Sequence, residues 1–155
     1  MAIKERDIKM ISHFRNNARQ SLTNLSKMTK IPVSTIFDKL KEYEENSLIK
    51  KHTSLLDFKK LGYDIRTQIL LTAGTEGREK LQKFLMMHPR VNTIYRINNG
   101  FDFLIEGIFR NMTELDSFGA ELDAQKPLDK KEFFIMEEMK REEFLSYKEN
   151  LGIQR

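Results

Sequence analysis

The sequence predicts an α+β protein made of two parts, a small helical N-terminal unit and a larger C-terminal unit in which strands and helices alternate. In the first part, apolar residues recur every three or four positions as far as Glu45, which is the spacing of amphipathic helices. From Ile65 onward, stretches of alternating pattern appear between two further helical stretches. Such a change of period is typical of a chain that folds as two separate units.

The composition narrows the class of protein further. Hydrophobic residues make up 39% of the 155 residues, and no stretch approaches the ~20 apolar residues that a membrane helix needs. Met1 is followed by a charged stretch, so no secretory signal is expected. The absence of cysteine excludes disulfides, thiolate metal sites and cysteine catalysis, and it is typical of a cytosolic protein.

The formal charge of +4 is distributed unevenly along the chain. Residues 1–60 contain 13 lysines and arginines against 7 acidic residues, whereas residues 61–155 contain 14 against 16. A basic N-terminal third on a mildly acidic remainder is the distribution expected of a nucleic-acid-binding head on a separate body. A charged surface without a binding function would also account for it, so charge alone favours DNA binding only modestly.

Residues 21–45 predict two short helices joined by a tight turn. Ser21 is a suitable N-cap for the first helix, and Ile31-Pro32 ends it because proline lacks the N–H group that a continuing helix needs. The second helix is expected to begin near Ser34. The apolar faces of these helices and of an earlier helix over Lys4–Asn16 supply a small core: Ile8, Ile11, Phe14, Leu22, Leu25, Met28, Ile36, Leu40 and Tyr43. Taken alone, this stretch fits a helix-turn-helix and an ordinary helical hairpin about equally well.

In a helix-turn-helix protein, the start of the second helix faces the base edges and nearby cations contact the phosphates. We expect the start of the second helix here to read bases through Val33, Ser34, Thr35, Phe37 and Asp38. Phe37 is suited to a thymine methyl group and Asp38 to a cytosine amino group. The candidates for phosphate contacts are Lys27, Lys30, Lys39, Lys41, Lys50 and Lys51. The sequence therefore predicts double-stranded DNA as a partner.

Residues 46–63 are expected to complete the first domain with a wing and then to form a short linker. Leu48–Thr53 and Leu55–Asp57 are interpreted as the strands of a short hairpin, the wing of a winged helix-turn-helix. The expected organisation is a winged helix-turn-helix domain over residues 1–57, a linker over 58–63, a second domain over 64–140 and a charged tail over 141–155. In and before that tail, Met139, Phe144, Tyr147 and Leu151 fit a short helix.

The second domain shows six elements in the order β-α-β-β-α-β. Strands are predicted over 67–72, 91–97, 101–109 and 132–139, and helices over 78–88 and from Thr113 onward. The second of these helices is expected to open with a capping box, Thr113-x-x-Asp116. Asn98-Asn99-Gly100 predicts a hairpin turn, since Asn-Gly supplies the positive φ angles that such turns require. This order is that of the ferredoxin-like αβ-sandwich.

Two strands of this domain are apolar on both faces. The residues concerned are Phe101, Phe103, Ile105 and Phe109 against Leu104 and Ile108, and Phe133 and Ile135 against Phe134 and Met136. Two helices cover only one face of a four-stranded sheet, so the other face needs a second cover. A second copy of the same sheet is the simplest cover, and we therefore expect a homodimer.

Short motifs follow one another in order along residues 3–139. They are Asp7-Ile8-x-x-Ile11-x-x-Phe14-x-x-x-Ala18-Arg19, Ser34-Thr35-Ile36-x-x-Lys39-Leu40-Lys41-x-Tyr43-Glu44, Leu48-Ile49, Leu61-Gly62-Tyr63 and Gly100-Phe101-Asp102-Phe103-Leu104. Together they resemble the Lrp/AsnC (leucine-responsive, feast/famine) family of transcriptional regulators. The chain departs from that pattern at Ser47, where glycine is usual, at Lys126–Lys131 before the last strand, and in a longer, more charged tail.

The resemblance implies a sequence-specific regulator with a winged helix-turn-helix head and a dimerising body that senses a small effector, usually an amino acid. It also implies that dimers often assemble further, commonly into octamers. The effector is expected near the hairpin, at Asn98, Asn99, Gly100, Phe101 and Asp102. There, backbone N–H groups and the Asp102 carboxylate would receive the carboxylate and ammonium groups of an amino acid.

The sequence shows no catalytic or metal-binding pattern. His13, His52 and His88 lie in different predicted elements without metal-ligand spacing, and no P-loop, nucleophile elbow or dinucleotide fingerprint occurs. We therefore expect no metal, no cofactor and no enzyme activity. Two alternatives remain open. One is a nucleoid-like architectural protein that binds DNA broadly, and the other is an enzyme like the sirohaem decarboxylases, which resemble this two-part architecture.

Overall fold

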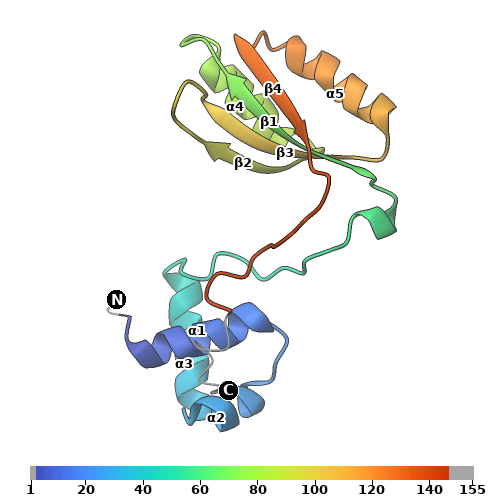
Figure 1. Cartoon of the computed structure of the whole chain (residues 1–155). Helices are drawn as coiled ribbons and strands as arrows, with labels where there is room; N and C mark the ends of the chain where they lie inside the picture. The colour runs from blue at the N-terminus through green and yellow to red at the C-terminus, as the bar shows by residue number, and fades with distance from the viewer. Residues whose placement is uncertain (1–2, 147–155) are drawn as a thin grey trace. The chain divides into compact units, whose positions relative to one another are not determined.

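The computed structural model describes residues 3–146, and these fall into two compact units (Figure 1). One unit contains the described residues up to Ser54 together with those from Met139 onward, and the other is Leu55–Glu138. The expected α+β class, a helix-turn-helix followed by a ferredoxin-like unit, is confirmed. No helix within the described residues is long and apolar enough to cross a membrane.

Three helices form the first unit: α1 (Glu5–Asn16), α2 (Leu22–Thr29) and α3 (Val33–Glu45). Their shared core consists of Met10, Leu25, Ile36 and Tyr43, with Ile11, Phe14, Leu22, Ile31, Leu40 and Ile49 packed against it. The predicted cap of α2 is confirmed, since Ser21 Oγ accepts a hydrogen bond from the Asn24 N–H at 3.1 Å. Ile8 and Met28, which we expected in this core, are about two-fifths exposed.

The hairpin predicted over residues 48–57 is wrong. Between Glu45 and Ile65, all of which the structure describes, the only regular element is the 3₁₀ helix η1 (Lys59–Leu61). Ile49 packs against the core, but Leu55 and Leu56 are more than half exposed, so no core holds the second half of this segment in place. A lone two-stranded hairpin is marginal in water, and residues 52–54 lack the glycine, asparagine or aspartate that a tight turn favours.

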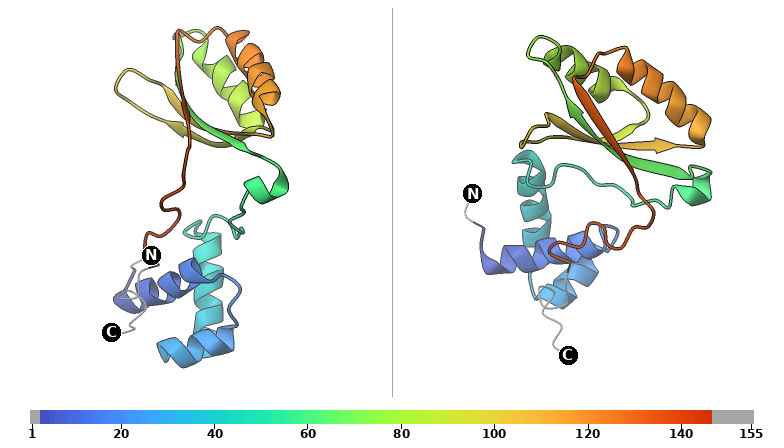
Figure 2. Two further views of the ribbon diagram at one scale, coloured as in Figure 1. Left: turned by 45° about the vertical axis from the view of Figure 1, so that its right-hand side comes forward. Right: turned by 45° about the horizontal axis from the view of Figure 1, so that its top comes forward.

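The second unit is a four-stranded antiparallel sheet with two helices on one of its faces (Figure 2). In chain order its elements are β1 (Ile65–Thr72), α4 (Arg78–Met87), β2 (Val91–Arg96), β3 (Phe103–Phe109), α5 (Met112–Asp123) and β4 (Asp129–Phe134). The strand order is β2-β3-β1-β4. The core between sheet and helices is built from Ile69, Leu71, Leu81, Leu85, Phe103, Ile105, Phe109, Leu115, Phe118 and Leu122.

Two predicted boundaries in this unit are wrong. The last strand covers Asp129–Phe134 rather than 132–139, because its charged first residues pair with β1 as well as Phe133 and Phe134. Lysines on an edge strand are common, since they discourage pairing with other chains. α5 is not capped by Thr113 with Asp116. Its N-cap is Asn111, whose Oδ1 accepts the Glu114 N–H at 3.0 Å.

The sheet face opposite the helices is partly apolar and partly charged. The strand register places Leu70, Tyr95, Leu104, Ile108 and Phe133 on it, with Tyr95 and Phe133 more than half exposed. On the same face, Glu106 is only 8% exposed and accepts hydrogen bonds from Arg66 and Asn92. Arg66 also forms an ion pair with Glu138, which follows β4. The strands are therefore two-sided, as predicted, but the second face has a charged centre.

Candidate nucleic-acid interface and ligand site

The turn between α2 and α3 is fixed by side chains of α2. Lys30 ends α2 in the left-handed conformation, with φ of 61°. Ser26 Oγ donates a hydrogen bond to the Ile31 carbonyl at 2.5 Å, and Thr29 Oγ1 donates to the Leu25 carbonyl at 2.8 Å. Pro32 then serves as the N-cap of α3. These bonds set the direction in which α3 leaves the turn.

The buried and exposed faces of α3 are clearly separated. Ile36 and Tyr43 are fully buried. Because successive helical residues turn by 100°, the side opposite them carries Ser34, Phe37, Asp38 and Lys41. Phe37 is 58% exposed, an unusual position for a large aromatic ring in a small unit that has a core of its own. The structure thus brings four of these site residues onto one outward face.

The remaining predicted base-reading residues lie on the flanks of that face. Val33 is 42% exposed at the first turn, whereas Thr35 is half-buried on the other side. The geometry therefore separates the five predicted residues into a central group, Ser34, Phe37 and Asp38, and two flanking residues.

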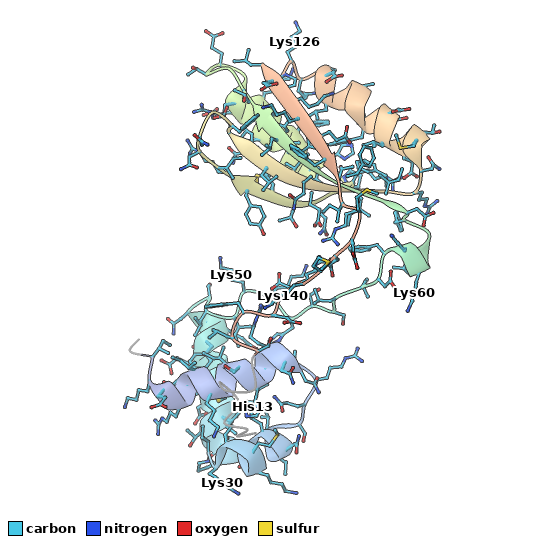
Figure 3. All side chains as sticks on the ribbon, in the orientation of Figure 1. His13, Lys30, Lys50, Lys60, Lys126 and Lys140 are labelled. Carbon is cyan, nitrogen blue, oxygen red and sulfur yellow. The ribbon has the colours of Figure 1, made fainter. Side chains whose placement is uncertain are left out.

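The six predicted phosphate-binding lysines differ in their surroundings. Lys39 Nζ lies 2.7 Å from Glu42 Oε2, and Lys41 Nζ lies 3.8 Å from Glu45 Oε1. The other four lysines are exposed and form no ion pair with a described residue: Lys27, Lys30, Lys50 and Lys51. Figure 3 shows Lys30 at the end of α2 and Lys50 beyond the end of α3.

Tyr43 and Asp7 connect α3 to the start of α1. Asp7 is 3% exposed, and its Oδ2 accepts the Lys4 N–H at 2.9 Å. Burial raises the pKa of Asp7, but the Lys4 N–H, the Tyr43 hydroxyl and nearby cations outweigh it and hold that pKa below its usual value. Burial and the Asp7 carboxylate together raise the pKa of Tyr43 well above its usual value. Both pKa shifts favour the same protonation states, an ionised Asp7 beside a neutral Tyr43.

His13 lies inside the same unit (Figure 3). Its side chain is almost fully buried, and its Nε2 has no hydrogen-bond partner among the described residues. Burial, assisted by the charge of Lys9, lowers the pKa of His13. The imidazole is therefore a neutral part of the core. Within residues 3–146, no group of three or more histidine, aspartate or glutamate residues is arranged to hold a metal ion.

The predicted hairpin turn between β2 and β3 is confirmed. Asn99 and Gly100 have φ angles of 64° and 90°, and the Ile97 N–H donates to the Asp102 carbonyl at 3.0 Å. Thr72 Oγ1 donates to the Gly100 carbonyl at 2.8 Å, which ties the turn to the end of β1. The five residues predicted to bind an effector, 98–102, therefore lie together on one loop, and Asn98, Asn99 and Gly100 are exposed.

The Asp102 carboxylate already has two partners within the protein. Its Oδ2 accepts the Ala73 N–H at 2.7 Å, and its Oδ1 lies 2.7 Å from Arg78 Nη2. Arg78 opens α4, its side chain is 38% exposed, and its Nε has no hydrogen-bond partner in the described part of the chain. Lys131 Nζ lies 5.2 Å from the centre of the Phe101 ring. Sequence reasoning missed Arg78 and Lys131 because only the fold brings α4 and β4 to this loop.

Comparison with known proteins places the chain among transcriptional regulators. No family model matches it. It is 27% identical to the HTH-type transcriptional regulator FL11 of Pyrococcus horikoshii over 75% of this chain and 77% of that protein. It is 25% identical to the glutamate uptake regulatory protein of Zymomonas mobilis over 90% of this chain and 87% of that protein. An uncharacterized HTH-type transcriptional regulator of Pyrococcus furiosus is 22% identical over 93% of this chain and 97% of its own length.

Solved structures show the same fold. A transcriptional regulator of Neisseria meningitidis in complex with L-methionine superposes with a TM-score of 0.83 at 19% identity, covering 90% of this chain and 94% of that one. LrpC of Bacillus subtilis gives 0.82 at 18% identity, covering 90% and 99%. AsnC of Escherichia coli gives 0.81 at 15% identity, covering 91% and 97%. These neighbours confirm the fold that the motifs imply.

Proposed function

We infer that the chain is a DNA-binding transcriptional regulator of the Lrp/AsnC type, acting in the cytoplasm as a homodimer or a larger assembly and modulated by a small effector. One observation carries the DNA-binding role. A helix fixed by the turn before it presents Ser34, Phe37, Asp38 and Lys41 outward, while its other side is fully buried. Such a surface on the second helix of a helix-turn-helix fits the major groove.

We assign different tasks to the residues around α3, the recognition helix. Ser34, Phe37 and Asp38 would read base edges, with Val33 and Thr35 at the margins. Lys27, Lys30, Lys50 and Lys51 would contact phosphates, since no carboxylate of a described residue forms an ion pair with them. Lys39 and Lys41 would reach phosphates only by leaving Glu42 and Glu45. The general attraction to DNA would therefore come mainly from outside α3.

The open face of the sheet would bind a second copy of the chain. It carries Leu70, Leu104, Ile108 and the exposed Tyr95 and Phe133, and no helix of the described chain covers it. A face-to-face pair would place two heads in one particle, as a two-fold symmetric operator requires. Assembly of dimers into octamers, which the family resemblance implies, stays a prediction.

The hairpin over residues 98–102 is proposed as the place where an amino acid acts. The relatives named for glutamate uptake and solved with L-methionine support this ligand class. Since Asp102 is held by Ala73 and Arg78, we assign it the task of orienting Arg78. The partly exposed guanidinium of Arg78 and the exposed turn of Asn98, Asn99 and Gly100 would receive the ligand.

The experiment that tests the function is in vitro selection of bound DNA with the full-length protein, followed by affinity measurements at fixed salt. A regulator is expected to enrich one motif and to bind it at least about 10³-fold more tightly than random DNA. Equal affinity for both would support a broad architectural role instead. A screen of the twenty amino acids for altered binding then tests the effector, with Arg78→Met expected to abolish the response. The relatives named above are regulators, which argues against the alternative of an enzyme like the sirohaem decarboxylases. A Soret absorption band of the purified protein, which would indicate a bound tetrapyrrole, would support that alternative.

A further inference from the structure

The chain passes between its two units twice. It leaves the first unit after Ser54, builds the second unit over Leu55–Glu138, and returns to the first unit from Met139 onward. Figures 1 and 2 show this returning segment beside α1. We call residues 139–146 the tail clip. The predicted tail helix is not present in this part, and its positions Tyr147 and Leu151 lie outside the described residues.

An arginine of α1 holds the tail clip. Arg15 Nε donates to the Phe144 carbonyl at 3.2 Å, and its Nη2 donates to the Glu142 carbonyl at 3.0 Å. The same Nη2 lies 2.9 Å from Glu142 Oε2. The planar guanidinium thus binds two backbone carbonyls and one carboxylate of a segment about 127 positions away in the sequence.

The backbone of the tail clip is bent to make these contacts. Glu142 and Leu145 have φ angles of 52° and 64°, which residues other than glycine rarely adopt. Ser146 closes the turn, because both its N–H and its hydroxyl donate to the Glu143 carbonyl, at 3.1 and 2.8 Å. This backbone conformation costs energy and persists only where surrounding contacts stabilise it, so two such residues in one turn indicate a docked segment.

A second arginine holds the chain just before the tail clip. The Ile135 N–H donates to the Arg66 carbonyl at 2.8 Å, continuing the ladder beyond β4, and the Arg66 side chain is ion-paired with Glu138. Glu138 and Glu142 are four residues apart, and four residues span at most ~14 Å. The connection between the two anchors is therefore short. By contrast, the other connection runs from Ile49, which packs on the core of the first unit, to Ile65 at the start of β1, and it contains one turn of 3₁₀ helix.

We propose that the tail clip is a second tether, which restrains the DNA-binding unit through Arg15 and thereby limits its motion relative to the sheet. A head held by one long irregular segment reorients freely, whereas a head held also by a short segment does not. In a dimer, the clip would narrow the range of half-site spacings that the two heads can reach together. The Arg15–Glu142 pair is partly exposed, so salt is expected to loosen the restraint.

The test measures head motion directly and needs no DNA, so it stays valid if the proposed function fails. The chain has no cysteine, and Thr23→Cys on the exposed side of α2 therefore gives one attachment site for a dye in the full-length protein. Time-resolved anisotropy separates fast head motion from slow tumbling of the whole particle. Arg15→Ala, which removes all three contacts, is expected to raise the amplitude of the fast component about twofold.

Matched variants make the result specific. Arg19→Ala removes an exposed arginine near the same helix end and is expected to leave the amplitude unchanged. Glu142→Gln is expected to raise the fast amplitude by less than Arg15→Ala does, and Glu143→Gln is expected to leave it unchanged. The charge exchange, Arg15→Glu with Glu142→Arg, is expected to restore part of the restraint. Circular dichroism confirms that each variant folds. The same fast amplitude in the original protein, in Arg15→Ala and in Glu142→Gln would overturn the proposal.

Discussion

The ring of Phe109 lies directly over Gly107. A Cβ atom built on Gly107 would lie 2.6 Å from Phe109 Cε2 and 2.8 Å from Cζ, closer than real Cβ atoms come to a neighbour. Phe109 is fully buried in the core between the sheet and the helices, so its ring has no free space into which to move. The glycine is thus the complement of the ring, and the pair fixes the packing of β3.

Gly107→Ala is expected to lower the free energy of unfolding of the second unit by about 1–3 kcal/mol, because overpacking forces the ring off its preferred position. Gly119→Ala is the matched control. It lies within α5 with no heavy atom near its virtual Cβ, and it is expected to stabilise by roughly 0.5–1 kcal/mol. Chemical denaturation of both variants measures the difference. A Gly107→Ala protein as stable as the parent would show that the ring can shift freely.

The stability of the first unit is expected to fall in mildly acidic solution because of His13. Burial lowers its folded pKa below the usual 6.5, so the unfolded chain binds a proton more readily than the folded one. The stabilisation is therefore complete above about pH 6.5 and is lost as pH falls toward the lowered pKa. His13→Leu should flatten this dependence between about pH 7.5 and 5. His52→Leu, at an exposed position, should leave it unchanged, and identical thermal profiles for all three proteins would contradict the assignment.

Phe133→Asp is expected to convert the protein to a monomer, because it places a charge on the open sheet face. Phe133 is 52% exposed, so the change should not damage the fold of the single chain. Met86→Asp, on the helical side and 66% exposed, is the control and should not dissociate the dimer. Sedimentation velocity gives the assembly size. A dimer that survives Phe133→Asp while Met86→Asp dissociates it would locate the interface on the helices instead.

Asp38→Ala is expected to change which DNA sequence is preferred, by about 1–3 kcal/mol at one base pair. Lys41→Ala, on the same face of α3, should weaken binding to all sequences by similar factors. In vitro selection with each variant, followed by titration of the selected and parental motifs, separates the two effects. An unchanged motif for Asp38→Ala would remove that residue from base reading.

The double variant Lys27→Ala, Lys30→Ala should reduce the salt dependence of DNA binding. Each head loses two cations that form no ion pair with a described residue, so a dimer loses four, and the log–log slope should become shallower by roughly 3–4. Lys59→Ala with Lys60→Ala removes the same charge from the segment before β1 and is the control. Titrations of one duplex over a range of salt give the slopes. Equal slopes for both double variants would mean that only the net charge of the protein affects DNA binding, and not the positions of these lysines.

Local signals explain which parts of the fold could be predicted from the sequence. Ser21 and Asn99-Gly100 act on their immediate neighbours, so the cap of α2 and the hairpin turn followed from the residue types. Thr113 with Asp116 predicts the cap of α5, but Asn111 offers the same chemistry two residues earlier, with Glu114 in the matching position. Sequence alone does not decide between two neighbouring N-cap candidates, because the apolar pattern of the helix is the same for either starting residue.

Features that depend on contacts between distant segments could not be predicted. The apolar residues 133–136 predict a strand that runs too far toward the C-terminus, whereas hydrogen bonds to β1 decide where this edge strand runs. The pairing of Asp102 with Arg78 joins the hairpin to the start of α4, and the docking of the tail on Arg15 joins the two ends of the chain. Neither has a spacing that a linear pattern reveals.

The charges within α3 bear on how the protein searches DNA. Residues 33–45 contain two lysines and four acidic residues, and both lysines are paired with glutamates of the same helix. A helix of net charge −2 is repelled when it enters a groove lined by phosphates, and the proposed contacts to the correct bases would offset that repulsion. On random DNA the lysines outside α3 would hold the head at the surface while the helix stays out of the groove. The charge of α3 would then increase sequence discrimination, because the helix would enter the groove at a cognate site and not on random DNA.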